Sequence, residues 1–175
     1  MPVIKMLTCI ALVFGLQSAC ASSTEKAGDI IQIAVPALAF ASTFYVDDPE
    51  GRPQFYQSFG ANLLATQVLK RTVKKQRPDN SDNKSFPSGH TSAAFQGASF
   101  IHFRYGFKYA IPAYVAAGFV GYSRIDANKH DYVDIFTGAA LGILTSWYFT
   151  KPWKNVNLTP MIGENSVGLQ LSKPW

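Results

Sequence analysis

A chain of 175 residues predicts a single domain that can bury a core of its own, which argues against a multidomain protein. Hydrophobic residues make up 47% of the sequence and charged residues only 15%, yet a mean hydropathy of +0.03 is low for a protein that lies mostly in a membrane. The formal net charge of +5 favours anionic substrates or anionic membrane surfaces as partners.

The first residues have the features of an export signal. A lysine gives a positive start, residues 6–16 form an uncharged apolar run, and Ala19 and Ala21 fit a small-residue cleavage site. We therefore predict a signal peptide over residues 1–21 and an exported protein, periplasmic or membrane-associated, for which nucleic acid is not an expected partner. Two alternatives remain open, namely lipidation at Cys20 and an uncleaved first membrane helix.

Apolar stretches alternate with polar segments along the rest of the chain. A polar link is expected at residues 22–29. The pattern then predicts helices over residues 30–46, 54–75, 88–103, 110–122 and 133–149. Between them it predicts a loop at 47–53, polar loops at 79–85 and 123–131, and a break at 105–108. Two segments of alternating polarity near the end predict a β-hairpin, at residues 156–162 and 167–171.

These elements predict an all-α fold, a compact helical bundle with a short β-like C-terminal tail. Residues 22–52 are expected to form an N-terminal helix and loop, residues 53–150 the core, and residues 151–175 the tail. The charge-free windows of the helices are shorter than the roughly 20 apolar residues that a spanning helix needs. We therefore expect a bundle that lies on a membrane, and the alternative of an integral inner-membrane protein with a periplasm-facing site stays open.

The first of three chemically suggestive clusters is basic. Lys70 and Arg77 are seven residues apart, so on a helix they share a face with Lys74 between them. A bound phosphate would relieve the repulsion between these charges, and the arginine fork suits phosphate oxygens. The competing interpretation is a solvated basic helix face.

The second cluster, residues 87–92, places small residues at the start of a predicted helix. Unpaired N–H groups at such a start bind anions, and Gly89 lets the backbone approach a ligand closely. Ser88 can donate its hydroxyl or cap the helix, and His90 could give a proton beside a bound anion. An ordinary capped helix with an exposed histidine is the alternative.

The third cluster, residues 123–134, contains Arg124, His130 and Asp134. His130 and Asp134 are four residues apart, so a helix would place the carboxylate beside the imidazole. A carboxylate that accepts from one ring nitrogen sets the tautomer and leaves the other nitrogen able to attack an electrophile. A surface His–Asp pair of little consequence is the alternative. The remaining histidine, His102, lies in no cluster.

The three clusters together make the chain resemble the type 2 phosphatidic acid phosphatases, whose superfamily includes bacterial class A acid phosphatases and vanadium haloperoxidases. The signature of a lysine, six residues and Arg-Pro appears from Lys70 to Pro78, and Pro-Ser-Gly-His appears at residues 87–90. The signature of Ser-Arg, five residues, His, three residues and Asp appears at residues 123–134. The resemblance covers residues 53–149.

This resemblance implies a role for each matched position. His130 would attack phosphorus and become phosphohistidine, Asp134 would orient it, and His90 would protonate the leaving alcohol. The phosphoryl oxygens would be held by Lys70, Arg77, Ser88, Gly89 and Arg124. No cofactor is expected, because the sequence has no Cys/His spacing for zinc and no paired acidic ligands for magnesium or calcium.

The predicted function is therefore a metal-independent phosphatase that acts on phosphate monoesters or diphosphates, with phosphorylated lipids or small phosphate esters as substrates. Three alternatives stay open. The chain could be a vanadium-dependent haloperoxidase, a non-catalytic phosphate- or lipid-binding protein, or an enzyme that transfers phosphate to an acceptor other than water.

Overall fold

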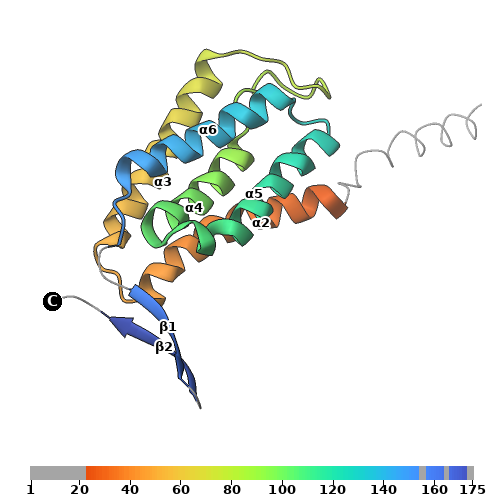
Figure 1. Cartoon of the computed structure of the whole chain (residues 1–175). Helices are drawn as coiled ribbons and strands as arrows, with labels where there is room; N and C mark the ends of the chain where they lie inside the picture. The colour runs from red at the N-terminus through yellow and green to blue at the C-terminus, as the bar shows by residue number, and fades with distance from the viewer. Residues whose placement is uncertain (1–22, 154–156, 164–165, 173–175) are drawn as a thin grey trace, which may run out of the picture.

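A computed structural model of the chain describes residues 23–153, 157–163 and 166–172, and the predicted export signal lies outside this part. Within it are five helices, namely α2 (Ser23–Tyr45), α3 (Gly51–Thr72), α4 (Gly89–Tyr105), α5 (Phe107–Asp126) and α6 (Tyr132–Phe149). An antiparallel hairpin of β1 (Asn157–Gly163) and β2 (Ser166–Ser172) follows them (Figure 1). This confirms the predicted all-α bundle with a short β tail.

α4 is the central helix and contacts each of the other four described helices (Figure 1). Its sequence is rich in alanine, serine and glycine, so its neighbours can approach its backbone closely. Ala94 and Ala98 are fully buried in one core cluster, and Phe100 fills a second one toward the far end of the bundle. Because α4 begins at residue 89, this arrangement places the second sequence cluster at the end of the central helix, among its neighbours.

Glycines make the closest approach between α4 and α6. A Cβ atom added to Gly138 would lie 2.5 Å from the carbonyl oxygen of Ser88, and one added to Gly142 would lie 2.5 Å from that of Ser92. The two glycines are four residues apart and therefore share one face of α6. No larger residue fits at either position without a shift of one backbone against the other, which ties the start of α6 closely to the start of α4.

The interior of the bundle is polar to an unusual degree. The hydroxyl of Ser92 donates to Asn62 at 2.6 Å, and the side-chain amide of Gln96 donates to Ser58 at 2.9 Å. Ser146 donates to the carbonyl of Gln96 at 2.9 Å, so these hydrogen bonds join α3, α4 and α6. Buried polar groups need such partners, and here they connect the helices in place of large apolar side chains.

Large apolar side chains lie on the outside instead, on α2, α3, α5 and α6, whereas the central helix α4 exposes none. Val115 and Phe136 are each 71% exposed, and Leu64 is 67% exposed. Where exposed apolar side chains form contiguous patches, they mark contact with a membrane or a partner. By length and composition, α2 is the one described helix that could cross a membrane.

Several predicted boundaries were wrong. Residues 23–29 of the expected polar link are helical: α2 begins at Ser23 with an acidic residue in its first turn, which the helix dipole favours. The expected loop at 47–53 is shorter, because Asp48 accepts the N–H of Gly51 at 2.9 Å and starts α3 there. The break at 105–108 reduces to Gly106, whose φ of 109° ends α4 and begins α5.

Candidate active site

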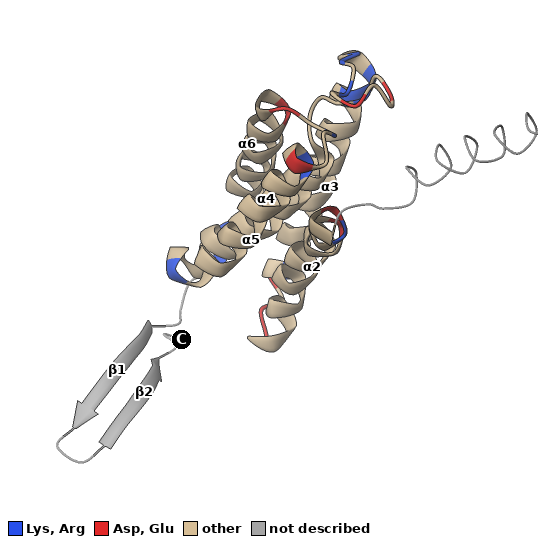
Figure 2. Ribbon diagram, turned by 90° about the vertical axis from the view of Figure 1, so that its right-hand side faces the viewer, with Lys and Arg blue, Asp and Glu red and all other residues tan. Residues whose placement is uncertain are grey.

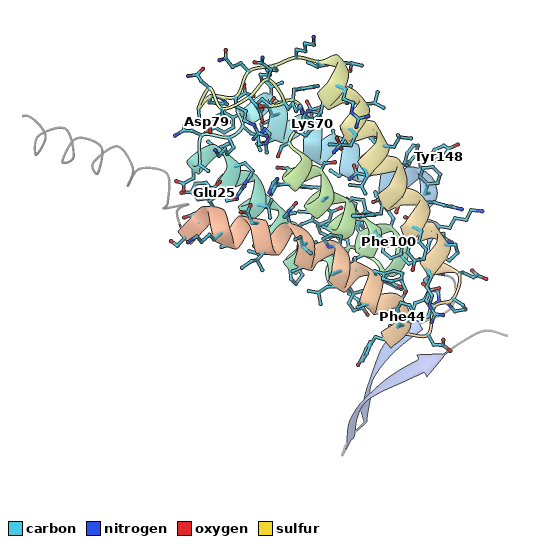
Figure 3. All side chains as sticks on the ribbon, turned by 180° about the vertical axis from the view of Figure 1, so that it is seen from behind. Glu25, Phe44, Lys70, Asp79, Phe100 and Tyr148 are labelled. Carbon is cyan, nitrogen blue, oxygen red and sulfur yellow. The ribbon has the colours of Figure 1, made fainter. Side chains whose placement is uncertain are left out.

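The three sequence clusters meet at one end of the bundle. α3 and α5 end there, and α4 and α6 begin there, so two helix N-termini with their partial positive charges point into the same region. In Figure 3 the labels of Lys70, Asp79 and Glu25 all lie at this end, whereas Phe44 lies at the other. Figure 2 shows the charged residues at the helix ends and loops, with the middle of the bundle largely uncharged.

His130 lies in the loop before α6, and its side chain is almost completely buried. Its Nδ1 is 3.5 Å from Oδ2 of Asp134, and its Nε2 is 3.4 Å from Nη1 of Arg77. The carboxylate thus lies beside the imidazole, although not through helical spacing, because His130 is outside α6. His130 precedes Asp131, which is the N-cap of α6. The capping box between Asp131 and Asp134 brings the carboxylate of Asp134 back toward the imidazole.

Asp134 is fully buried and held on both oxygens. Lys75 donates to Oδ1 at 2.8 Å, while the backbone N–H of Asp131, at 3.2 Å, and the hydroxyl of Ser85 donate to Oδ2. Burial acts to raise the pKa of Asp134, but these hydrogen bonds outweigh it and hold the pKa below its ordinary value. The group beside Nδ1 of His130 is therefore a carboxylate.

The imidazole of His130 is neutral at ordinary pH. Burial, followed by the positive charges of Arg77 and Lys70, lowers its pKa to about 4, and Asp134 only partly opposes them. Since Nδ1 faces the carboxylate, the ring proton is placed there and the lone pair is on Nε2. That nitrogen faces the guanidinium of Arg77.

Lys70 and Arg77 reach the site by different routes. The prediction that they share a helix face is wrong, because α3 ends at Thr72. Arg77 lies in the following loop, where Asp82 accepts from its Nε at 2.9 Å. Lys70 donates to the carbonyl of Lys84 at 2.8 Å, and burial together with the charge of Arg77 lowers the pKa of its ammonium group to about 8.

The start of α4 lies against Lys70. A Cβ added to Gly89 would be 3.6 Å from Cε of Lys70, so the first and second sequence clusters are in contact. Ser88 is the N-cap: its Oγ accepts the N–H of Thr91 at 3.4 Å, and its own N–H donates to the carbonyl of Asp134 at 3.0 Å. This last bond joins the α4 N-terminus to the element that carries Asp134.

His90 and Arg124 meet on a carboxylate of α2. Oδ1 of Asp29 is 3.0 Å from Nε2 of His90 and 2.9 Å from Nη1 of Arg124. Arg124 also donates to the carbonyl of Glu25 at 2.7 Å and to Oγ of Ser123 at 3.1 Å. A guanidinium has five N–H donors, so these three contacts leave two for a ligand.

The PAP2 superfamily matches residues 50–157, which is more than half of the chain and includes all three clusters. The chain belongs to the PAP2 superfamily.

Several curated relatives match parts of the chain. A lipid A 1-phosphatase of Porphyromonas gingivalis is 42% identical over 78 residues, which are 43% of this chain and 18% of the relative. A lipid A 4'-phosphatase of Helicobacter pylori is 31% identical over 110 residues, 57% of this chain and 54% of the relative. The chain thus spans from about a fifth to about half of the length of these relatives.

One solved structure has the same arrangement of helices. The crystal structure of Aquifex aeolicus LpxE aligns with a TM-score of 0.57 at 22% identity, covering 69% of this chain and 84% of that one. At that identity the likeness supports the PAP2 fold of this chain.

Four residues of the site were missed by sequence reasoning: Asp29, Lys75, Ser85 and Asp131. Two signals were available, since Asp131 and Asp134 have the spacing of a capping box and Lys75 stands inside the first signature. Nothing local pointed to Asp29. Within the described ranges, no three His, Cys, Asp or Glu side chains group as metal ligands.

Proposed function

We propose that this PAP2 protein is a phosphatase that cleaves phosphate monoesters or diphosphates of lipids through a phosphohistidine at His130. The observation that carries the proposal is the pairing around that imidazole. Nδ1 lies against a buried carboxylate, and Nε2 lies against Arg77, where a phosphoryl group would be held. A neutral buried histidine with a cationic site at its attacking nitrogen is suited to a phosphate ester.

The chemistry follows from these positions. The lone pair of Nε2 forms a P–N bond as the P–O bond to the leaving alcohol breaks, and His90 donates a proton to that oxygen. Water then attacks phosphorus while His90 takes one of its protons, the P–N bond breaks, and inorganic phosphate leaves. Charge on the phosphoryl oxygens would be stabilised by the cationic and N–H groups predicted for this purpose, namely Lys70, Arg77, Ser88, Gly89 and Arg124.

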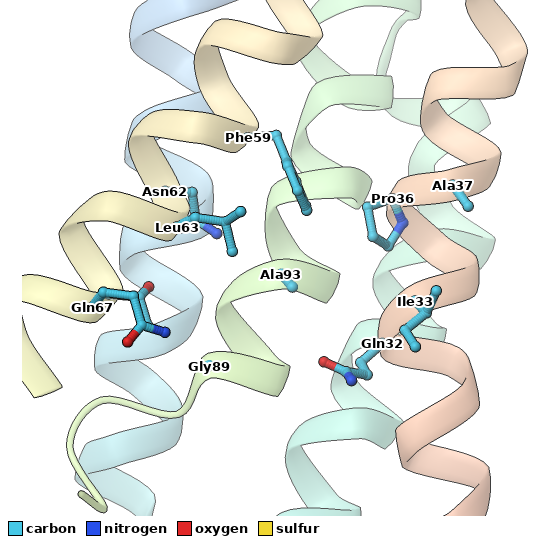
Figure 4. A pocket seen from close by; sticks show the side chains of 11 residues that line it. Gln32, Ile33, Pro36, Ala37, Phe59, Asn62, Leu63, Gln67, Gly89 and Ala93 are labelled. Atoms are coloured by element: carbon cyan, nitrogen blue, oxygen red, sulfur yellow. The ribbon is translucent and has the colours of Figure 1, made fainter.

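A groove beside the site supports a lipid as substrate. It has a volume of about 430 Å³ and runs between α2 and α3 over α4, from Gly89 at the site to Phe59 (Figure 4). Ile33, Leu63 and Pro36 contribute apolar walls. Because Gly89 belongs to both the phosphate site and the groove, a phosphate bound at α4 would have its apolar chain directed along the groove. The relatives' names, lipid A phosphatases among them, agree with this substrate class.

The exposed apolar side chains support a membrane location. They lie on the four helices that surround α4, and several are more than half exposed, including Ile30, Tyr122 and Trp147. We infer an exported protein whose site works at a membrane surface, with these side chains in contact with lipid. Carbonate extraction of membranes from expressing cells tests this, and a protein recovered with the soluble periplasmic contents would contradict it.

The decisive test of the activity uses detergent-purified protein with lipid phosphates and a chromogenic phosphate ester, with chelator present throughout. We expect phosphate release, inhibition by vanadate, and loss of turnover in His130→Ala by at least about 1,000-fold. Acid-labile radioactive phosphate trapped on the wild type and absent from the variant would identify the intermediate. Ordinary activity in His130→Ala would remove the proposed nucleophile, and halide oxidation with vanadate and peroxide would favour the haloperoxidase alternative.

A further inference from the structure

α2 contributes to the site a carboxylate that belongs to none of the three signatures. Asp29 lies upstream of the region that the PAP2 superfamily matches. Its Oδ1 bridges Nε2 of His90 on α4, at 3.0 Å, and Nη1 of Arg124 on α5, at 2.9 Å. One oxygen therefore connects two residues that are both proposed to act on the phosphate ester.

The position of Asp29 is set by close packing of the neighbouring turn. A Cβ added to Gly28 would lie 2.0 Å from Oγ of Ser123 and 2.9 Å from Nη2 of Arg124, so only glycine allows α2 to approach α5 here. The carbonyl of Glu25, one turn earlier, accepts from the same guanidinium at 2.7 Å. The packing at Gly28 and the hydrogen bond at Glu25 therefore hold this turn of α2 against α5, and Asp29 with it.

A carboxylate that accepts from one nitrogen of an imidazole orients the ring and determines which nitrogen is available for chemistry. Asp29 engages Nε2 of His90, which leaves Nδ1 as the nitrogen that can give a proton to the leaving oxygen. The charges that face His90 are Asp29 from α2, Arg124 from α5 and Arg77 from the loop after α3. Of these groups, Asp29 alone favours the protonated ring.

We propose that Asp29 is a positioning residue for the general acid, holding His90 so that Nδ1 delivers the proton to the leaving alcohol. This inference rests on the proposed phosphatase function. Asp29 also contacts Arg124, so a substitution could act by displacing the guanidinium instead. The two roles differ in one respect: an effect on the acid depends on the leaving group, whereas an effect on phosphate binding does not.

The test compares two esters of the same phosphate, an alkyl phosphate with a poor leaving group and p-nitrophenyl phosphate with a good one. In Asp29→Asn we expect kcat/KM for the alkyl ester to fall about 10- to 100-fold and that for p-nitrophenyl phosphate by less than about 3-fold. His90→Ala should show the same leaving-group dependence. Asp29→Glu keeps the charge and should restore part of the alkyl-ester activity.

The pH dependence of kcat/KM for the alkyl ester provides a second readout. Burial, and after it the charge of Arg124, lowers the pKa of His90, while Asp29 acts in the opposite direction. The acid must be protonated, so activity on the alkyl ester is lost as the pH rises through this pKa. Removing the charge of Asp29 should therefore move the basic limb of the kcat/KM profile to lower pH.

Asp126→Asn is the matched control, because it removes the same charge from an exposed position at the end of α5. It should change kcat/KM for either ester by less than about 2-fold. An equal loss for both esters in Asp29→Asn, or no loss, would overturn the positioning role alone. A wild-type protein that hydrolyses neither ester would overturn the proposed function and this inference with it.

Discussion

Gly138 is where helix packing and the proposed chemistry can be perturbed together by a single methyl group. In Gly138→Ala the new Cβ would lie 2.5 Å from the carbonyl oxygen of Ser88, about 0.9 Å short of an ordinary contact at 3.4 Å. The atom it meets is backbone, so a rotamer change cannot relieve the clash. α6 must move away from α4 by several tenths of an ångström.

The size of the effect follows from two opposing contributions. Alanine in place of glycine inside a helix stabilises by about 0.5–1 kcal/mol, and overpacking a tight contact costs about 1–3 kcal/mol. Gly118→Ala on α5 is the matched control, because a Cβ there meets nothing within 4 Å and only the stabilising contribution remains. The helical contribution is the same in both variants, so we expect the free energy of unfolding of Gly138→Ala to lie about 1–3 kcal/mol below that of Gly118→Ala.

The displacement should also reach the chemistry. The N–H of Ser88 donates to the carbonyl of Asp134. Moving α6 away from α4 therefore separates Asp134, the carboxylate partner of His130, from the N-terminus of α4, where phosphate is proposed to bind. Misplacement of about 1 Å can cost roughly 100-fold in rate, and we expect a loss of kcat/KM of about 10-fold or more in Gly138→Ala. Denaturant unfolding in detergent and initial rates on a lipid phosphate measure both effects. A Gly138→Ala protein as stable and as active as Gly118→Ala would refute this reasoning.

Two further predictions concern the nucleophile and the groove. Because His130 must be neutral to attack and its pKa is about 4, the acidic limb of the kcat/KM profile should lie near pH 4, with activity lost as the pH falls through it. Arg77→Gln removes a charge that lowers this pKa and should move the limb to higher pH; a wild-type limb near 6.5 would contradict the assignment. Ala37 lines the groove and is exposed, so Ala37→Phe should lower kcat/KM for a long-chain lipid phosphate about 10-fold and leave p-nitrophenyl phosphate within about 2-fold. Ala41→Phe, one turn further along α2 and outside the lining, is the control, and equal losses on both substrates in Ala37→Phe would argue against a chain in the groove.

Residue types and spacings alone determined the all-α fold and the three clusters. Apolar stretches of helical length, separated by polar loops, were enough to predict the helices, because an amphipathic or apolar helix is encoded within a short window of sequence. The cluster residues also came from local patterns. Lys70, His90 and His130 were named from cations and histidines that occur where apolar segments meet polar ones, and the structure brings their three clusters to one end of the bundle.

Tertiary structure alone decided how those residues face one another. His130 lies in a loop and Asp134 is the N3 residue of α6, whose capping box with Asp131 places its carboxylate next to that loop, and Arg77 lies in a loop held by Asp82. Asp29 is 61 residues before His90 and 95 before Arg124, so no local pattern could connect them. Asp29 reaches His90 and Arg124 because Gly28 lets α2 approach α5. The packing of two helix backbones depends on the whole fold rather than on any one segment.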